Sequence, residues 1–237
     1  MDSKITQSAW ILLGGLAVSW FLVILIVLRY PGNASSKGTH LGYVGLASIA
    51  LLVAGAVIAS LGASHRTPEC RADARLGMVV GLVTGCVWVL EISFNNFVDP
   101  RVSTASARFV VDNSAWGFTA LVILIASCAQ TWHTGRFSSA IRVGLNSGVT
   151  SGLISCLMGL LLVLVWMPFL MRDPLNIQEY AVRGTREQSP GMATYFAYDT
   201  MSGALGHLMV LGLIMGILLG AIGGLVALTP GWVRRRV

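Results

Sequence analysis

Six apolar segments dominate the sequence, and most approach the roughly 20 residues that an α-helix needs to cross a hydrocarbon layer of about 30 Å. They cover residues 11–28, 41–61, 76–92, 117–129, 143–170 and 204–228. Only 11% of all residues are charged, against about a quarter in soluble domains. A segment inside lipid must satisfy its own backbone amides, so these segments are expected to be helices. The sequence therefore predicts an all-α polytopic membrane protein with six transmembrane helices, forming a single domain over residues 1–237.

The distribution of Lys and Arg predicts that both termini are cytoplasmic. Nine of the 16 basic residues fall near Lys4, in the loops around Arg71 and Arg136, and in the stretch 234–236. The other seven lie in the opposite loops, where acidic residues offset them. Because positively charged loops tend to stay inside, we expect a multi-pass protein of the inner (plasma) membrane with an N-in/C-in arrangement.

The same topology predicts two outer loops, at residues 93–115 and 171–202. Asp112 and Asp199 are expected to cap the fourth and sixth spans, because a carboxylate accepts hydrogen bonds from free amides at a helix start. Within the second loop, residues 176–186 are expected to form a short interfacial helix. Trp88 falls near the outer end of the third span, and tryptophan prefers the membrane interface.

Glycines recur at every fourth position in three of the spans. The motif Arg-x-Gly-x3-Gly-x3-Gly occurs twice, with Gly77, Gly81 and Gly85 in the first copy and Gly144, Gly148 and Gly152 in the second. A longer stripe follows at Gly212, Gly216, Gly220 and Gly224. Such stripes allow close approach of helix backbones. They predict tight packing inside the bundle or, alternatively, contact with a membrane-protein partner or a second copy. Spans three–four and five–six resemble two direct copies of one hairpin; chance in a chain with 27 glycines is the alternative.

Glu91 and His207 are the main candidates for a ligand or proton site. An ionisable group at membrane depth is costly and is by default a functional hypothesis. Glu91 lies about one helical turn from the outer end of the third span, and His207 lies about two turns below Asp199 in the sixth. On an ideal helical wheel His207 points away from the glycine stripe of its own span. Asn95 and Asp199 complete the set of candidates, and a Glu91–His207 pair would relay protons, bind a cation or join two helices.

Ser151-Gly152, together with His207 on a later glycine-rich span, resembles the Ser/His helices of rhomboid intramembrane proteases. The resemblance is incomplete, because Val149 stands where the GxSG motif of that family has its first glycine. That family also has a further transmembrane helix between its Ser and His helices. Ser151 lies in the inner half of its span and His207 in the outer half, roughly 10 Å apart in depth at 1.5 Å per residue. A proton transfer needs a much shorter distance, so the sequence argues against this activity.

No other motif assigns chemistry to the chain. It has no Walker, HExxH or CxxC motif, its basic residues lie at span ends rather than in a nucleic-acid-binding patch, and no cofactor or metal site can be named. The lipid bilayer is the partner that the composition implies. The sequence favours a small integral-membrane subunit that is transport-related or acts as a scaffold with partner proteins. The alternative is an intramembrane enzyme or a redox subunit associated with haem or quinone.

Overall fold

Six helices in the computed structural model of the protein are long and apolar enough to cross a membrane. The structure describes residues 7–31, 39–64, 67–184, 189 and 191–234. Lys4, residues 235–236 and part of the predicted outer loop (185–188 and 190) lie outside the described residues. Within the described ranges every regular element is a helix and no strand occurs. The prediction of an all-α, multi-pass membrane protein is confirmed.

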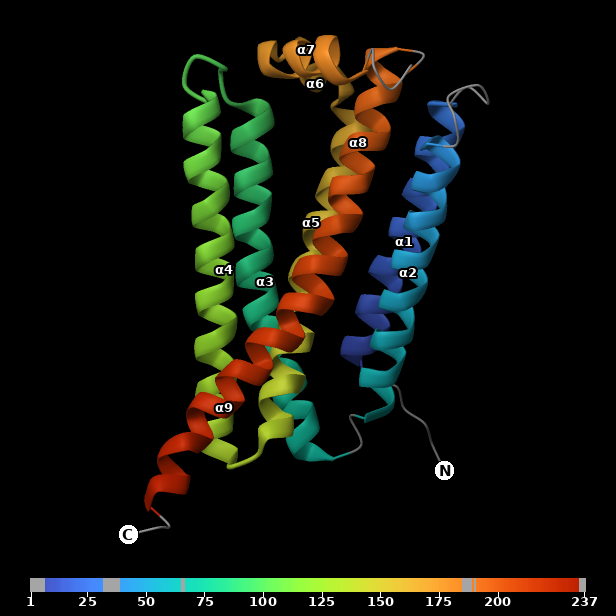
Figure 1. Ribbon diagram of the computed structural model, residues 1–237. Coiled ribbons are helices and arrows are strands. Elements are labelled where there is room, and N and C mark those ends of the chain that lie inside the picture. The colour runs from blue at the N-terminus through green and yellow to red at the C-terminus, as the bar shows by residue number, and fades with distance from the viewer. Residues whose placement is uncertain (1–6, 32–38, 65–66, 185–188, 190, 235–237) are drawn as a thin grey trace.

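The first five spans are single helices and the sixth is a composite. The single helices are α1 (Gln7–Arg29), α2 (Thr39–Ser64), α3 (Pro68–Phe97), α4 (Ala105–Thr134) and α5 (Phe137–Val165). The sixth span runs without interruption through α8 (Met192–His207), the π-helical η2 (Leu208–Met215) and α9 (Gly216–Arg234). Figure 1 shows this last span crossing the bundle diagonally, from beside α5 at one end to α4 at the other.

Three short helices lie across one end of the bundle, which we call the α7 end (Figure 1). They are α6 (Met167–Arg172), α7 (Pro174–Glu179) and the π-helical η1 (Tyr180–Gly184). The short helix expected at residues 176–186 is therefore present as α7 and η1. The opposite end, where α3 begins, is called the Asp73 end.

The ends of the spanning helices differ from the prediction. Thr104 caps α4 by accepting a hydrogen bond from the amide of Ala107, and within the stretch predicted as an outer loop at 93–115 only residues 98–104 lie between helices. Asp112 and Asp199 lie inside α4 and α8 and cap neither helix, which corrects both predicted caps. Hydropathy reports only the part of a helix that lies in hydrocarbon, whereas a helix continues through polar residues until a capping residue ends it.

Helix α5 is the centre of the bundle because glycines let two neighbours approach its backbone. Glycines 77, 81 and 85 of α3 face α5; a Cβ added at Gly81 would lie 2.5 Å from Thr150 Cβ and 2.6 Å from the Ser147 carbonyl oxygen. Glycines 144, 148 and 152 of α5 face the backbone of the sixth span, where residues 212, 216 and 220 are also glycine. Gly224 meets Phe137 at the start of α5. All three stripes are thus packed against helices of the same chain.

Helix α1 docks on the last turn of α5 through a side-chain hydrogen bond. Pro168 has no amide N–H, so the carbonyl of Leu164, four residues earlier, loses its helical donor. The Arg29 guanidinium donates to this carbonyl oxygen at 2.8 Å. Below this contact, Leu16 and Ile26 of α1 share a buried apolar cluster with Leu153 of α5.

Candidate functional site

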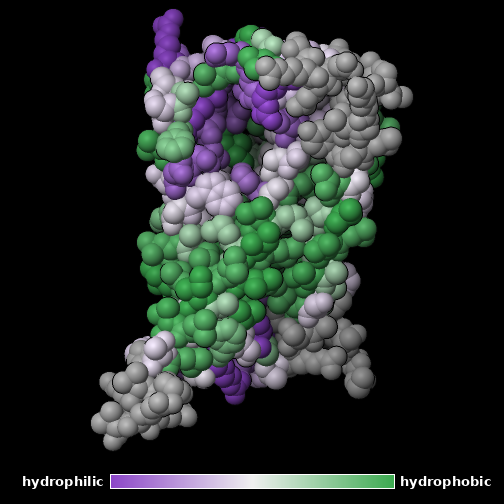
Figure 2. All heavy atoms as spheres, in the orientation of Figure 1, coloured by the Kyte–Doolittle hydropathy of each residue, from purple (hydrophilic) through white to green (hydrophobic). Residues whose placement is uncertain are grey.

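A cavity of about 320 Å³ lies at the α7 end, between α3, α5, α7 and α8. Figure 2 shows a hollow surrounded by hydrophilic residues at this end, above a broad hydrophobic belt. All four candidates from the sequence line the cavity; its polar and charged residues are Glu91, Asn95, Asn96, Arg108, Ser155, Asn176, Glu179, Asp199, Thr200 and His207. Polar residues from four spans and from the short helix α7 therefore meet in one place.

Glu91 is buried on α3, and its carboxylate is held by a residue of the same helix. Asn95, one turn later, donates a hydrogen bond from Nδ2 to Glu91 Oε1. Asp112 of α4 lies near enough to Glu91 for the two charges to interact. Two acidic groups thus approach each other where α3 faces α4, and an added positive charge would stabilise both.

His207 bonds to α5 and packs between two tryptophans. Its Nδ1 lies 2.6 Å from Ser155 Oγ, a hydrogen bond that links α8 to α5. The rings of Trp88 and Trp116 lie 4.8 Å and 5.9 Å from the imidazole, centroid to centroid. Trp88 is completely buried, so its indole packs inside the bundle beside His207 and is not in contact with lipid headgroups.

Glu91 and His207 line the same cavity but do not bond to each other. Among the described residues no hydrogen bond or ion pair joins their side chains, and each binds a different neighbour: Asn95 for Glu91, Ser155 for His207. The direct pair considered from the sequence is therefore absent here, and any coupling between the two acts through the cavity.

Ser155, rather than Ser151, is the serine that contacts His207. Ser151 is buried, and its hydroxyl has no hydrogen-bond partner in the described structure. Ser155 lies one helical turn nearer the α7 end, which brings it level with His207. A comparison of depth along α5 could have found Ser155, whereas the partial GxSG pattern directed attention to Ser151.

The arginine that lines the cavity among the described residues is already paired with a carboxylate. Arg108 of α4 forms an ion pair with Asp173, which also caps α7 by accepting a hydrogen bond from the Leu175 amide. Glu179 accepts hydrogen bonds from Arg183 at 2.9 Å and from the Tyr195 hydroxyl at 3.0 Å. These contacts fix α7 over the cavity.

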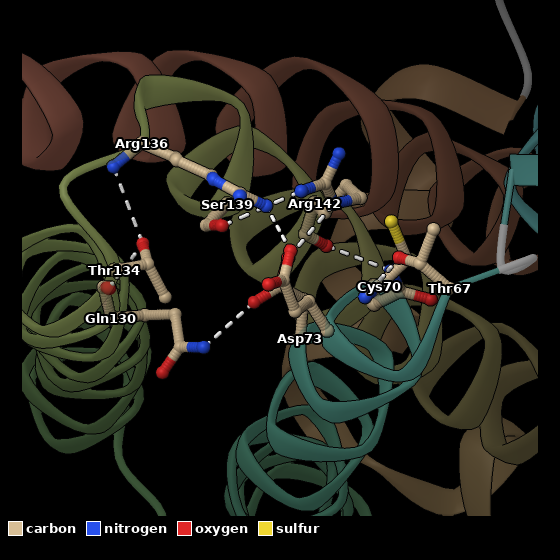
Figure 3. Close-up of polar contacts among 10 residues, drawn as sticks. Thr67, Cys70, Asp73, Gln130, Thr134, Arg136, Ser139 and Arg142 are labelled. Carbon is tan, nitrogen blue, oxygen red and sulfur yellow. Dashed lines mark hydrogen bonds and ion pairs between the residues drawn. The ribbon is translucent and has the colours of Figure 1, made fainter.

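The Asp73 end of the bundle is closed by a second polar cluster, which sequence reasoning missed (Figure 3). The Asp73 side chain is 0% exposed. It accepts hydrogen bonds from Arg142 Nε at 2.8 Å and from Gln130 Nε2 at 2.7 Å, which joins α3, α4 and α5. Figure 3 shows the carboxylate between these two donors. No local pattern in the sequence marks Asp73, because both of its partners lie on other helices.

In the part of the chain that the structure describes, no group of three or more His, Cys, Asp or Glu side chains is placed to hold a metal ion. The carboxylates are instead spread around the cavity wall, an arrangement that suits a cation larger than a single atom. Comparisons with protein-family models, with curated proteins and with solved structures find no match to this chain.

Proposed function

We propose that the protein is a transport-related integral-membrane subunit whose cavity binds a small organic cation that enters from the α7 end. The observation that carries the proposal is the convergence of Glu91, Asp199 and the Arg183-paired Glu179 on one cavity, where the single lining arginine among the described residues, Arg108, is neutralised by Asp173. A volume of about 320 Å³ is near the lower limit for small-molecule sites. The charge of the wall therefore selects cations, and the volume selects small ones.

The closed opposite half supports a transport role over a purely structural one. Below the cavity, the glycine stripes bring α5 into backbone contact with both α3 and the sixth span, and the Asp73 cluster joins three helices at the far end. A site that is accessible from one side and closed on the other is what alternating access requires. The distribution of Lys and Arg favours an arrangement with the α7 end outside the cell, and in that arrangement the cation would enter from the exterior.

Saturable binding of radiolabelled tetramethylammonium to the purified protein tests the proposed site. We expect Glu91→Gln to weaken binding by about tenfold or more, because losing about 1.4 kcal/mol of charge–charge interaction changes an affinity by that factor. Glu69→Gln is the matched control, since Glu69 pairs with Arg136 at the opposite end. Absence of binding by the unaltered protein, or equal affinities for the two variants, would contradict the proposal.

The Ser155–His207 contact supports a second candidate function, that of an intramembrane acyl-transfer enzyme. A serine hydroxyl becomes a nucleophile when an adjacent imidazole accepts its proton, and the 2.6 Å distance between Oγ and Nδ1 is within the range for such a transfer. Both groups line the cavity, so a substrate there would reach them. We prefer the cation-binding function because it also gives a role to the carboxylates that line the cavity.

A fluorophosphonate probe distinguishes the two candidates. An active serine would attack phosphorus, so that the Oγ–P bond forms, the P–F bond breaks, fluoride leaves and His207 takes the proton. If the second candidate holds, labelling is expected in the unaltered protein and in Ser151→Ala, and is expected to fall at least tenfold in Ser155→Ala. Labelling that survives Ser155→Ala, or that never occurs, excludes it.

A further inference from the structure

A second and larger cavity, of about 760 Å³, lies between α3 and α4 at the α7 end. Its walls are apolar side chains of both helices, among them Leu90, Phe94, Val110 and Phe118. Leu90 and Val110 are also strongly exposed on the hydrophobic surface, so we call this feature the lateral groove. In a membrane-spanning bundle such a surface faces lipid chains.

Glu91 lines both the lateral groove and the polar cavity. It is the single charged residue among those that line the groove, and the nearby charge of Asp112 on α4 has the same sign. The two spaces therefore meet at an acidic point, with an apolar region on the lipid side and a polar region on the interior side. This arrangement matches the two parts of a charged amphiphile.

We propose that the lateral groove and the polar cavity together bind a single-chain amphiphile with a cationic head group, which enters sideways from the bilayer. The alkyl chain would lie between α3 and α4, and the head group would lie beside Glu91. The inference rests on the proposed cation site and names the class of molecule that the site takes.

The affinity in this arrangement comes from the head group. Lipid tails are as apolar as the groove, so moving a chain from the bilayer into the groove adds no hydrophobic driving force. The groove orients the molecule, and the carboxylate selects its charge. Two amphiphiles with the same chain and opposite head-group charges should therefore differ strongly in how often they occupy the groove.

Photocrosslinking in phosphatidylcholine nanodiscs tests this preference. The probes are dodecyltrimethylammonium and dodecyl sulfate, each with a diazirine in the chain, and labelled peptides of α3 and α4 are identified by mass spectrometry. We expect the ammonium probe to label residues 87–98 and 110–118 at least fivefold more than the sulfate probe does. In Glu91→Gln the difference should fall to less than twofold.

Two variants on α4 separate binding in the groove from general contact with lipid. Ser114→Trp fills the groove and should remove most of the labelling by the ammonium probe. Leu121→Trp adds the same side chain at an exposed position that does not line the groove, and should leave the labelling unchanged. Thermal unfolding of both variants checks that each is folded, and Val110→Trp repeats the blocking test from a second position.

The outcomes separate this inference from the proposed function. If tetramethylammonium binds but the two amphiphiles label the groove equally, the inference fails and the cation site stands. If the sulfate probe labels more strongly, the groove takes anionic lipid and the inference is again overturned. If tetramethylammonium does not bind and groove labelling is insensitive to Glu91→Gln, both proposals fail together.

Discussion

Replacing Gly148 with leucine is expected to prevent normal assembly of the bundle. A Cβ at this position would lie 2.6 Å from the carbonyl oxygens of Leu211 and Gly212, and 3.1 Å from Gly216 Cα. All three are backbone atoms, so no side chain can rotate away, and α5 must separate from the sixth span. Overpacking of a core costs about 1–3 kcal/mol and occasionally more; we expect the upper end of this range, with a lowered unfolding temperature and a reduced monodisperse fraction in size-exclusion chromatography.

Gly117→Leu is the matched control for this experiment. Gly117 lies within α4, and a Cβ added there meets nothing within 4 Å. Leucine has a higher helix propensity than glycine by roughly 1 kcal/mol at most helical positions, so this variant should be as stable as the original protein or more so. Equal losses of stability in the two variants would show that the glycine stripe does not hold the helices together.

Loss of the Asp73 carboxylate is expected to have the second largest effect. Asp73→Ala leaves the Arg142 guanidinium, whose side chain is only 19% exposed, without its anion, and leaves Gln130 Nε2 without its acceptor. Breaking a buried ion pair by removing one partner costs about 3–5 kcal/mol. Because Arg142 retains some access to solvent, we expect about 3 kcal/mol, measured as the change in free energy of unfolding in detergent or bicelles.

The Glu69–Arg136 ion pair supplies the control for Asp73. It lies at the same end of the bundle, but its side chains are 58% and 56% exposed, and an exposed pair contributes about 1 kcal/mol or less. Glu69→Ala should therefore have a small effect. In a double-mutant cycle, Asp73→Ala combined with Arg142→Ala should lose less stability than the sum of the single variants; additive losses would mean that the pair does not contribute as described.

The sequence was sufficient to predict the spans and four residues of the cavity wall. Apolar segments report burial in lipid directly, and the cost of placing Glu91 and His207 at membrane depth singled them out before any geometry was known. The glycine stripes could likewise be recognised in the sequence, because four-residue spacing places small residues on one helix face. These features depend on one helix at a time, which is the scale at which a single sequence is informative.

Features that depend on two helices were missed or misjudged. Asp73 contacts Arg142 and Gln130 only after α3, α4 and α5 have packed together, so no local sequence pattern predicts these contacts. The choice between Ser151 and Ser155 depends on how far α5 is displaced along α8. Trp88 was assigned to the interface from its position near a span end, whereas contact with His207 and Trp116 buries it.

His207 faces the same neighbouring helix as the glycine stripe, contrary to the helical-wheel prediction. An ideal α-helix directs His207 and the stripe that starts at Gly212 to different sides, yet both face α5: His207 bonds to Ser155, and Gly216 packs on Gly144. The π-helical η2 lies between His207 and Gly216 and contains Gly212, and its i→i+5 hydrogen bonds change the angular relation between the residues before and after it. A wheel drawn with a constant period cannot represent that change.

The π-helical segment η2 divides the sixth span into two helical rods, α8 and α9. The side-chain faces of these two rods are rotated relative to each other, compared with a continuous α-helix; this rotation is the phase between them. The rod before η2 carries His207 and faces the cavity, and the rod after η2 carries the glycines that fit α5 and α4. Substitutions within either rod keep the phase, whereas an insertion or deletion of one residue inside η2 would rotate one rod against the other by the angle of one residue, which in a π-helix is somewhat less than the roughly 100° of an α-helix. The length of this segment, more than its side chains, is therefore what keeps His207 and the glycine stripe on the same neighbour.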